Sequence, residues 1–287
     1  MTSASTPFNL EPYNSRLERF FGEVAVIQHY QRLSADVAKL TISDLQERDK
    51  QLSGLDDETR ELMGKSVNLF SFYNPYTGVI HPYFHKAVSH QETARLVHLH
   101  KNKQYQWLLV EAYELFEDFV VSLYEFIRAE SGLFRLGKDA DLPTSELKKK
   151  VPQIIDMLRK KLPELARMEV ENQTETNLRL HICMAEKFRH VIVHKNGKTG
   201  DAATMVDKIL KSANLLGDKA REQGARQTIT NYIGTGDVEG VLALVERSVF
   251  RYGGLFIDIN RHENLVNALR AHALVTTQSL VNHMGKT

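Results

Sequence analysis

The chain has 287 residues, of which 42% are hydrophobic and 25% are charged, and its formal net charge at pH 7 is +1. This length and composition are sufficient to bury one sizeable core, or one domain with an extension. The balanced charge disfavours a histone-like binder or a polybasic membrane protein, although it is compatible with local basic patches.

Cysteine use and the N-terminal sequence indicate a reducing compartment. Cys183 is the single cysteine, so no disulfide can form within the chain, and the usual Cys-rich zinc sites are excluded. Residues 1–7 lack the charged start and the apolar stretch of a secretory signal, and no apolar run of about 18 residues occurs. We therefore expect a cytoplasmic protein without membrane contact.

In the first third of the chain, apolar residues recur at intervals of three and four, which predicts amphipathic helices. After an irregular lead-in, we expect one or two helices over residues 14–50 and a short helix from Asp57 to about Lys65. The stretch 68–85 is rich in aromatic residues and contains the turn signals Asn74-Pro75 and Thr77-Gly78.

The aromatic stretch is predicted to mark a boundary between an N-terminal helical extension, residues 1–88, and a main domain, residues 89–287. Its rings are expected to fill the seam between these two parts, and stacking on nucleobases is the alternative. The rings concerned are Phe70, Phe72, Tyr73, Tyr76, Tyr83 and Phe84.

Helical periodicity continues through the rest of the chain. Thr144 or Ser145 is expected to cap one of the helices, and the turn Lys195-Asn196-Gly197 is expected to end another. The predicted helices cover about 89–130, 144–161, 174–193, 202–215 and 260–284, and short strands are predicted at 225–233 and 254–258. The fold class expected is all-α: a helical bundle with an N-terminal helical extension and a small β-hairpin.

Arg189 is placed unusually within its predicted helix. Leu178, Ile182, Ala185 and Ile192 fall on the same stripe of a helical wheel, so Arg189 lies on an apolar face. A guanidinium stays charged in proteins, and an unpaired buried charge costs several kcal/mol. Arg189 therefore needs a carboxylate, an anionic ligand or a cleft.

Glu117 is a candidate partner for Arg189. It lies off the polar stripe of the predicted helix 104–128, beside Val110, Tyr113 and Val121. An acid among apolar side chains and a base on an apolar stripe suggest a buried or half-buried pair, although such a pair can simply hold two helices together.

His194 follows Arg189 where the helix is predicted to stop, so its imidazole is expected to be accessible and to exchange protons near neutral pH. An arginine that holds phosphate and a histidine that moves protons form the minimum set for cutting RNA through its own 2′-hydroxyl.

The segment Arg189-x4-His194, with the polar His190 directly after the arginine, resembles the R-x4–6-H motif of HEPN-domain proteins. The preceding helix WLLVEAYELFEDFVVSLY and the closing GLFIDINRHENLVNALRAHALVTTQSLV are also similar to that family. The resemblance covers roughly residues 89–287.

This resemblance implies a bundle of four to five helices that pairs into a homodimer, with the two motifs facing each other in one cleft. Many members are metal-independent RNases of toxin–antitoxin or anti-phage systems, and others only bind or act as scaffolds. Carried over by position, Arg189 holds the scissile phosphate, His194 acts as general base or acid, His190 orients the pair, and Glu117 positions Arg189.

Basic residues near this motif form a weaker candidate RNA surface. Lys148, Lys149 and Lys150 lie in one basic segment, and Lys195 and Asn196 follow His194 directly. A solvated helix face is the alternative explanation of such a run.

A metal site is the second chemical alternative. His190 and His194 have the spacing of two ligands on one helical face, with a third ligand required from His181 or Glu186. The histidine-rich stretch 81–100 is a further candidate for a metal, and in both places packing or acid–base roles are favoured.

The sequence therefore predicts a metal-independent endoribonuclease without a cofactor, active as a homodimer and with RNA as its partner. A regulatory protein such as an antitoxin is a further expected partner. The alternative function is a non-catalytic RNA-binding or protein-interaction module of the same fold.

Overall fold

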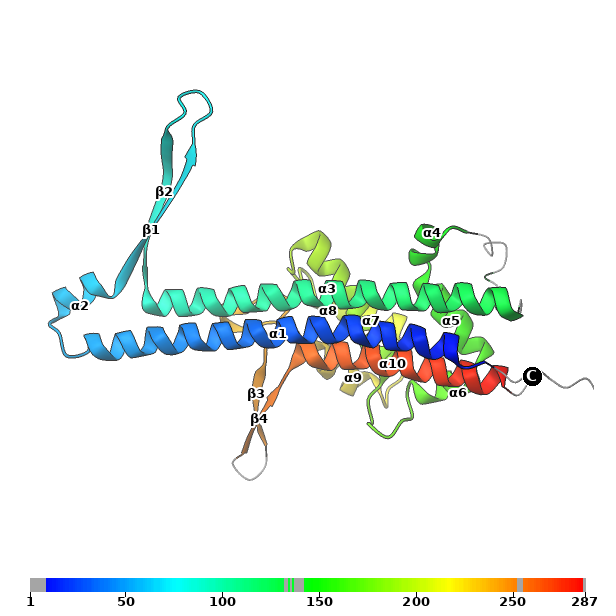
Figure 1. The fold of residues 1–287 in the computed structure, drawn as a ribbon. Helices are drawn as coiled ribbons and strands as arrows, with labels where there is room; N and C mark the ends of the chain where they lie inside the picture. The colour runs from blue at the N-terminus through cyan, green and yellow to red at the C-terminus, as the bar shows by residue number, and fades with distance from the viewer. Residues whose placement is uncertain (1–8, 132–133, 135, 137–141, 252–254, 286–287) are drawn as a thin grey trace, which may run out of the picture. The chain divides into compact units, whose positions relative to one another are not determined.

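The computed structural model describes residues 9–131, 134, 136, 142–251 and 255–285. Within these residues the chain is mostly helical, with ten α-helices, a short 3-10 helix η2 (Gly236–Val238) and two antiparallel two-stranded sheets (Figure 1). None of the helices in this described part is long and apolar enough to cross a bilayer.

The chain divides into two compact units. One unit comprises residues 1–30 with 105–287, and the other comprises residues 31–104. The long helices α1 (Glu11–Leu52) and α3 (His90–Ser131) each contribute residues to both units. The division therefore differs from the predicted boundary between residues 88 and 89, because that position lies inside the smaller unit.

The larger unit is helical around one hydrophobic core. Residues Tyr105–Ser131 of α3 contribute the rings of Tyr105, Tyr113, Phe116 and Tyr124, all of them buried. The other helices of this unit are α4 (Thr144–Lys148), α5 (Val151–Lys161), α6 (Pro163–Met168), α7 (Leu178–Lys195), α8 (Ala202–Ser212), α9 (Glu222–Thr230) and α10 (Arg261–Met284).

The smaller unit contains α2 (Asp57–Met63) and a hairpin of β1 (Lys65–Tyr73) and β2 (Ile80–Ser89), together with parts of α1 and α3. Asp56 caps α2 by accepting a hydrogen bond of 2.9 Å from the Thr59 amide. In Figure 1 the hairpin extends away from the helices of its own unit.

The aromatic stretch is thus a β-hairpin and does not fill a seam. The side chains of Phe70, Phe72, Tyr76, Tyr83 and Phe84 are between 45% and 96% exposed. The prediction of seam packing was wrong. The β-branched and aromatic residues on either side of the Asn74–Gly78 turn pair with each other as two strands. Both faces of the resulting hairpin stay exposed to solvent.

Of the two short strands predicted in this part of the chain, one differs from the structure and one is confirmed. Residues 225–233, predicted as a strand, lie largely in α9, where Ala225 and Ile229 are buried at helical spacing. The strand predicted at 254–258 is β4 (Leu255–Ile259), and its partner is β3 (Arg247–Arg251).

The predicted helix over 144–161 is divided into α4 and α5 by Lys149 and Lys150. Pro152 in the first turn of α5 cannot donate to a preceding turn, so the helix begins anew there. Thr144 does not cap α4. Its hydroxyl instead donates to Glu125 at 2.8 Å, and Pro143 occupies the cap position.

Candidate functional site

Helix α7 carries the predicted motif, and both of its ends are set by local sequence. The Asn177 side chain accepts a hydrogen bond of 2.9 Å from the Leu180 amide and caps the start. At the other end Asn196 and Gly197 adopt left-handed backbone conformations, with φ values of 54° and 79°. The positive φ favours glycine at position 197, and a Cβ there would lie 2.5 Å from the Gln106 side-chain oxygen, so a larger residue would force Gln106 to move.

Arg189 lies at the edge of the buried face of α7. Its side chain is 35% exposed, whereas the neighbouring Ala185 and Ile192 are buried. The Nη2 atom lies 3.5 Å from Glu114 Oε1 and 3.8 Å from Glu117 Oε2. The buried Nε atom has no hydrogen-bond partner among the described residues. Because these contacts are long and one donor is unused, the guanidinium retains capacity for an anion.

Glu117 is half-buried beside Arg189, which confirms the predicted proximity of the two side chains. Only 13% of the Glu117 side chain is exposed. Burial is the largest effect and raises the pKa of Glu117 from 4.5 to about 7, although Arg189 opposes this rise. The carboxyl group therefore changes protonation near neutral pH.

A groove of about 760 Å³ opens beside Arg189, and we call it the basic groove. Six of its lining side chains are lysine or arginine, against four carboxylates, so its charge favours an anion. The lining residues are Tyr113, Glu114, Glu117, Asp118, Lys148, Lys149, Pro152, Glu186, Lys187, Arg189, His190, Lys208, Lys211 and Ser212.

The lysines of the basic groove differ in how they are paired. Lys148 forms an ion pair with Asp118, and Lys187 with Glu186 at 2.8 Å. Lys208 and Lys211, on α8, form no ion pair within the described part of the chain. These two side chains, together with Arg189, are the cations most available to a phosphate.

His190 and His194 lie one turn apart at the end of α7, and both are exposed. Their ring centroids are 4.5 Å apart. His190 lines the basic groove, whereas His194 does not. Desolvation by the surrounding protein, followed by the positive charges nearby, lowers the pKa of His190, so the neutral ring predominates at pH 7.

The predicted RNA-contacting residues are only partly brought together. Lys148 and Lys149 line the basic groove, whereas Lys150, Lys195 and Asn196 do not. Asn196 serves as the left-handed end of α7, so its backbone has a structural role. Lys187, Lys208 and Lys211 were missed, although the spacing of Lys208 and Lys211 along an amphipathic helix was a signal for them.

We find no cluster of three or more His, Cys, Asp and Glu residues that could hold a metal, in the part of the chain that the structure describes. The alternative site at His190 and His194 therefore has no complete ligand set among these residues.

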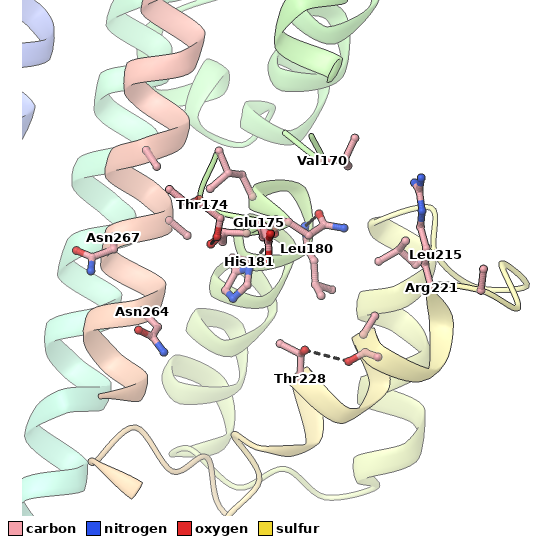
Figure 2. A pocket seen from close by; sticks show the side chains of 18 residues that line it. Val170, Thr174, Glu175, Leu180, His181, Leu215, Arg221, Thr228, Asn264 and Asn267 are labelled. Atoms are coloured by element: carbon pink, nitrogen blue, oxygen red, sulfur yellow. Dashed lines mark hydrogen bonds between the residues drawn. The ribbon is translucent and has the colours of Figure 1, made fainter. Parts of the chain in front are cut away.

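A second cavity, also of about 760 Å³, lies at the start of α7 (Figure 2). Its walls come from the loop after Val170, from α7, α9 and α10. His181, Asn264 and Asn267 line it, and the His181 Nδ1 atom lies 2.8 Å from the Asn177 carbonyl oxygen. Burial lowers the pKa of His181, so the ring is neutral at pH 7. Its arginine and histidine, Arg221 and His181, come from different segments and do not form an R-x4–6-H motif.

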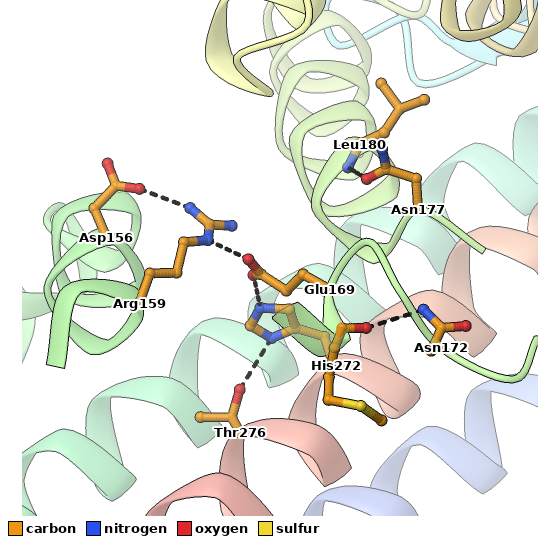
Figure 3. Close-up of polar contacts among 9 residues, drawn as sticks. Asp156, Arg159, Glu169, Asn172, Asn177, Leu180, His272 and Thr276 are labelled. Atoms are coloured by element: carbon orange, nitrogen blue, oxygen red, sulfur yellow. Dashed lines mark hydrogen bonds and ion pairs between the residues drawn. The ribbon is translucent and has the colours of Figure 1, made fainter. Parts of the chain in front are cut away.

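A buried ionic network links α5, α6 and α10 (Figure 3). Glu169 accepts hydrogen bonds from Arg159 Nε at 2.5 Å and pairs with His272 Nε2 at 2.8 Å. Glu169 and His272 are each 1% exposed. Burial alone would raise the pKa of Glu169, but the bonds to His272 and Arg159 outweigh it and hold this pKa at about 2.

Comparisons with protein-family models, with curated proteins and with solved structures found no match for this chain.

Replacing Glu117 with glutamine is expected to stabilise the protein at alkaline pH. The folded pKa of Glu117 is about 7 and its unfolded value is 4.5, so folding disfavours the ionised form. This penalty is absent below about pH 4.5, grows up to pH 7 and then stays constant, at roughly 3 kcal/mol.

Urea unfolding of the wild type and Glu117→Gln at pH 4 and pH 8 measures this difference. The variant should exceed the wild type in stability at pH 8 only. Glu114→Gln is the matched control, since that side chain is 55% exposed. Equal stability of wild type and Glu117→Gln at pH 8 contradicts the prediction.

Proposed function

We propose that this protein is a metal-independent endoribonuclease of HEPN type, with its active site in the basic groove. One observation carries the proposal. Arg189 is partly exposed at the wall of the basic groove, where Lys208 and Lys211 form no ion pair with the described residues. A carboxyl group with a pKa near 7 lies beside it, and His190, whose ring contacts that of His194, also lines the groove. An open groove of this charge suits the phosphodiester backbone of RNA.

In the proposed reaction the ribose 2′-oxygen attacks the adjacent phosphorus. The bond between phosphorus and the 2′-oxygen forms as the bond to the 5′-oxygen breaks, which leaves a 2′,3′-cyclic phosphate and a 5′-hydroxyl. A base takes the 2′-hydroxyl proton and an acid protonates the leaving 5′-oxygen. Arg189 neutralises the charge that develops on the phosphoryl oxygens.

His194 is assigned the role of proton carrier, and His190 keeps its ring in place through the contact of 4.5 Å. Glu117 positions the Arg189 guanidinium through its ion pair. One arginine–histidine pair is sparse for both proton transfers, so a homodimer across α7 supplies a second pair to the same cleft.

The test is incubation of purified protein with RNA in the presence of a chelator. We expect cleavage products that end in 2′,3′-cyclic phosphate, and His194→Ala is expected to slow cleavage by about 10²–10⁴-fold. His283→Ala is the control, because that histidine lies at the far end of α10. Cleavage that stops in chelator, or that is unaffected by His194→Ala, contradicts the proposal.

A non-catalytic RNA-binding module is the second candidate. It is favoured by one observation: His194 is not among the residues that line the basic groove. Under this alternative the wild type and His194→Ala bind RNA equally, and neither cuts it.

A further inference from the structure

The β1–β2 hairpin carries a row of aromatic side chains on one face, which we call the hairpin aromatic cluster. It consists of Phe70, Phe72, His81, Tyr83 and Phe84. Phe70 pairs with Phe84 and Phe72 with His81 across the two strands, so each pair points to one side. Tyr83 is the extra residue at the bulge and contacts both Phe70 and Phe72, with ring centroids 6.4 Å and 6.1 Å away.

This cluster has no cover within its own unit. Phe70 is 45% exposed, Phe72 48%, Tyr83 62% and Phe84 52%. Along Lys65–Ser89 Val88 is the one side chain that is buried. A two-stranded hairpin in water is marginally stable at best, and a contiguous exposed apolar surface marks an interaction site.

The charge of the hairpin argues for a protein partner over RNA. No aspartate or glutamate occurs from Lys65 to Ser89, and the two lysines in this range, Lys65 and Lys86, are ion-paired with Glu61 and Glu92, each at 2.6 Å. RNA needs free cations beside the stacking rings to neutralise its phosphates. An aromatic surface depleted in charge resembles the centre of a protein–protein interface.

The charge of the hairpin also permits contact between two identical surfaces. Because Lys65 and Lys86 are both ion-paired, no unbalanced charge repels the same face of a second chain. A fully exposed aromatic side chain has an area of roughly 200 Å². At their exposed fractions, the four phenylalanine and tyrosine side chains of the cluster therefore expose about 400 Å² per chain. With the backbone and the remaining side chains of this face, two copies bury on the order of 1,000 Å² in total, which is where specific interfaces begin.

We therefore propose that the hairpin aromatic cluster is a self-association surface, which packs against the same cluster of a second copy of this chain. The proposal is independent of RNA cleavage and of the dimer contact through α7. The surface lies on the β1–β2 hairpin, which belongs entirely to the smaller unit.

Sedimentation velocity of the full chain, from low to high micromolar concentration, tests this proposal. The double variant Phe72→Ser/Tyr83→Ser should raise the dissociation constant by about 30-fold or more, because two central aromatic residues are lost. At intermediate concentration, the average molar mass of the double variant should be half that of the wild type. Tyr76→Ser is the matched control: this residue is 96% exposed at the turn, lies outside the cluster, and should leave the mass unchanged.

A second double variant, Phe70→Ser/Phe84→Ser, keeps the test valid if the first one fails to fold. Circular dichroism shows whether each double variant is folded. A wild type that is monomeric throughout, or folded cluster variants that associate like the wild type, overturns the proposal. RNA binding that is lost in the cluster variants without any change of mass also overturns it, in favour of base stacking. RNA cleavage is assayed in parallel: its absence in the wild type counts against the proposed nuclease and leaves the association result intact.

Discussion

Replacing Arg189 with alanine is expected to lower the rate of RNA cleavage by about 10²–10³-fold, the usual effect of removing one preorganised donor to a developing charge. The protein should remain folded, because the Arg189 side chain is 35% exposed and its two ion pairs are long. Arg189→Lys should recover only part of the rate, since lysine is a point charge and cannot donate two parallel hydrogen bonds to a phosphate.

Single-turnover cleavage of a labelled RNA measures these rates, and thermal unfolding checks that the variants are folded. Arg19→Ala is a suitable control, because this arginine is 81% exposed and forms its ion pair with Glu23 on its own helix. Full activity in folded Arg189→Ala would falsify the assignment of this side chain to the scissile phosphate.

Removal of Glu169 is expected to have the largest effect on stability. Glu169→Ala leaves the largely buried Arg159 and His272 without their shared carboxylate, which costs about 3–5 kcal/mol of unfolding free energy. Asp156 also pairs with Arg159, at 2.6 Å, but it is 58% exposed. Asp156→Ala should therefore cost less than about 1 kcal/mol and serves as the control.

The same network makes stability depend on pH. The folded pKa of Glu169 is about 2 and its unfolded value is 4.5, so the ionised carboxylate stabilises the folded state. This contribution, roughly 3 kcal/mol, is fully present above about pH 4.5 and is lost as the pH falls toward 2. In urea unfolding, the gap between the wild type and Glu169→Gln should close over this range. A gap that persists unchanged at pH 2 contradicts the assigned pKa.

The candidate site was partly predictable because its signals are local in sequence. Arg189 is an unusual residue on an apolar stripe of α7, and Glu117 is an unusual residue on α3, so periodicity alone indicated that each needs a partner. The proximity of Arg189 and Glu117 followed from their opposite charges, since each needs a partner on an apolar face. The lysines of α8 were not predicted as part of the site: their spacing places them on one helix face, but nothing local indicates that this face lies beside α7.

The network around Glu169 illustrates the same limit. Arg159, Glu169 and His272 are ordinary surface-type residues in sequence, and 103 positions separate the last two. Only the packing of α10 on α6 and α5 buries them together, so no pattern within one helix reveals the network.

By itself the sequence determined most of the helices, their approximate ends and the pairing of Glu117 with Arg189, because helical periodicity and capping are properties of neighbouring residues. The tertiary structure decided the rest. It placed the aromatic residues of 68–85 on an open hairpin, arranged α8 beside α7 to form the basic groove, and divided the chain at residues 30 and 104. The groove and the division of the chain depend on contacts between residues that are distant in the chain, and local propensity does not specify such contacts. The hairpin itself is local, but its exposure depends on the absence of cover from other elements of its unit.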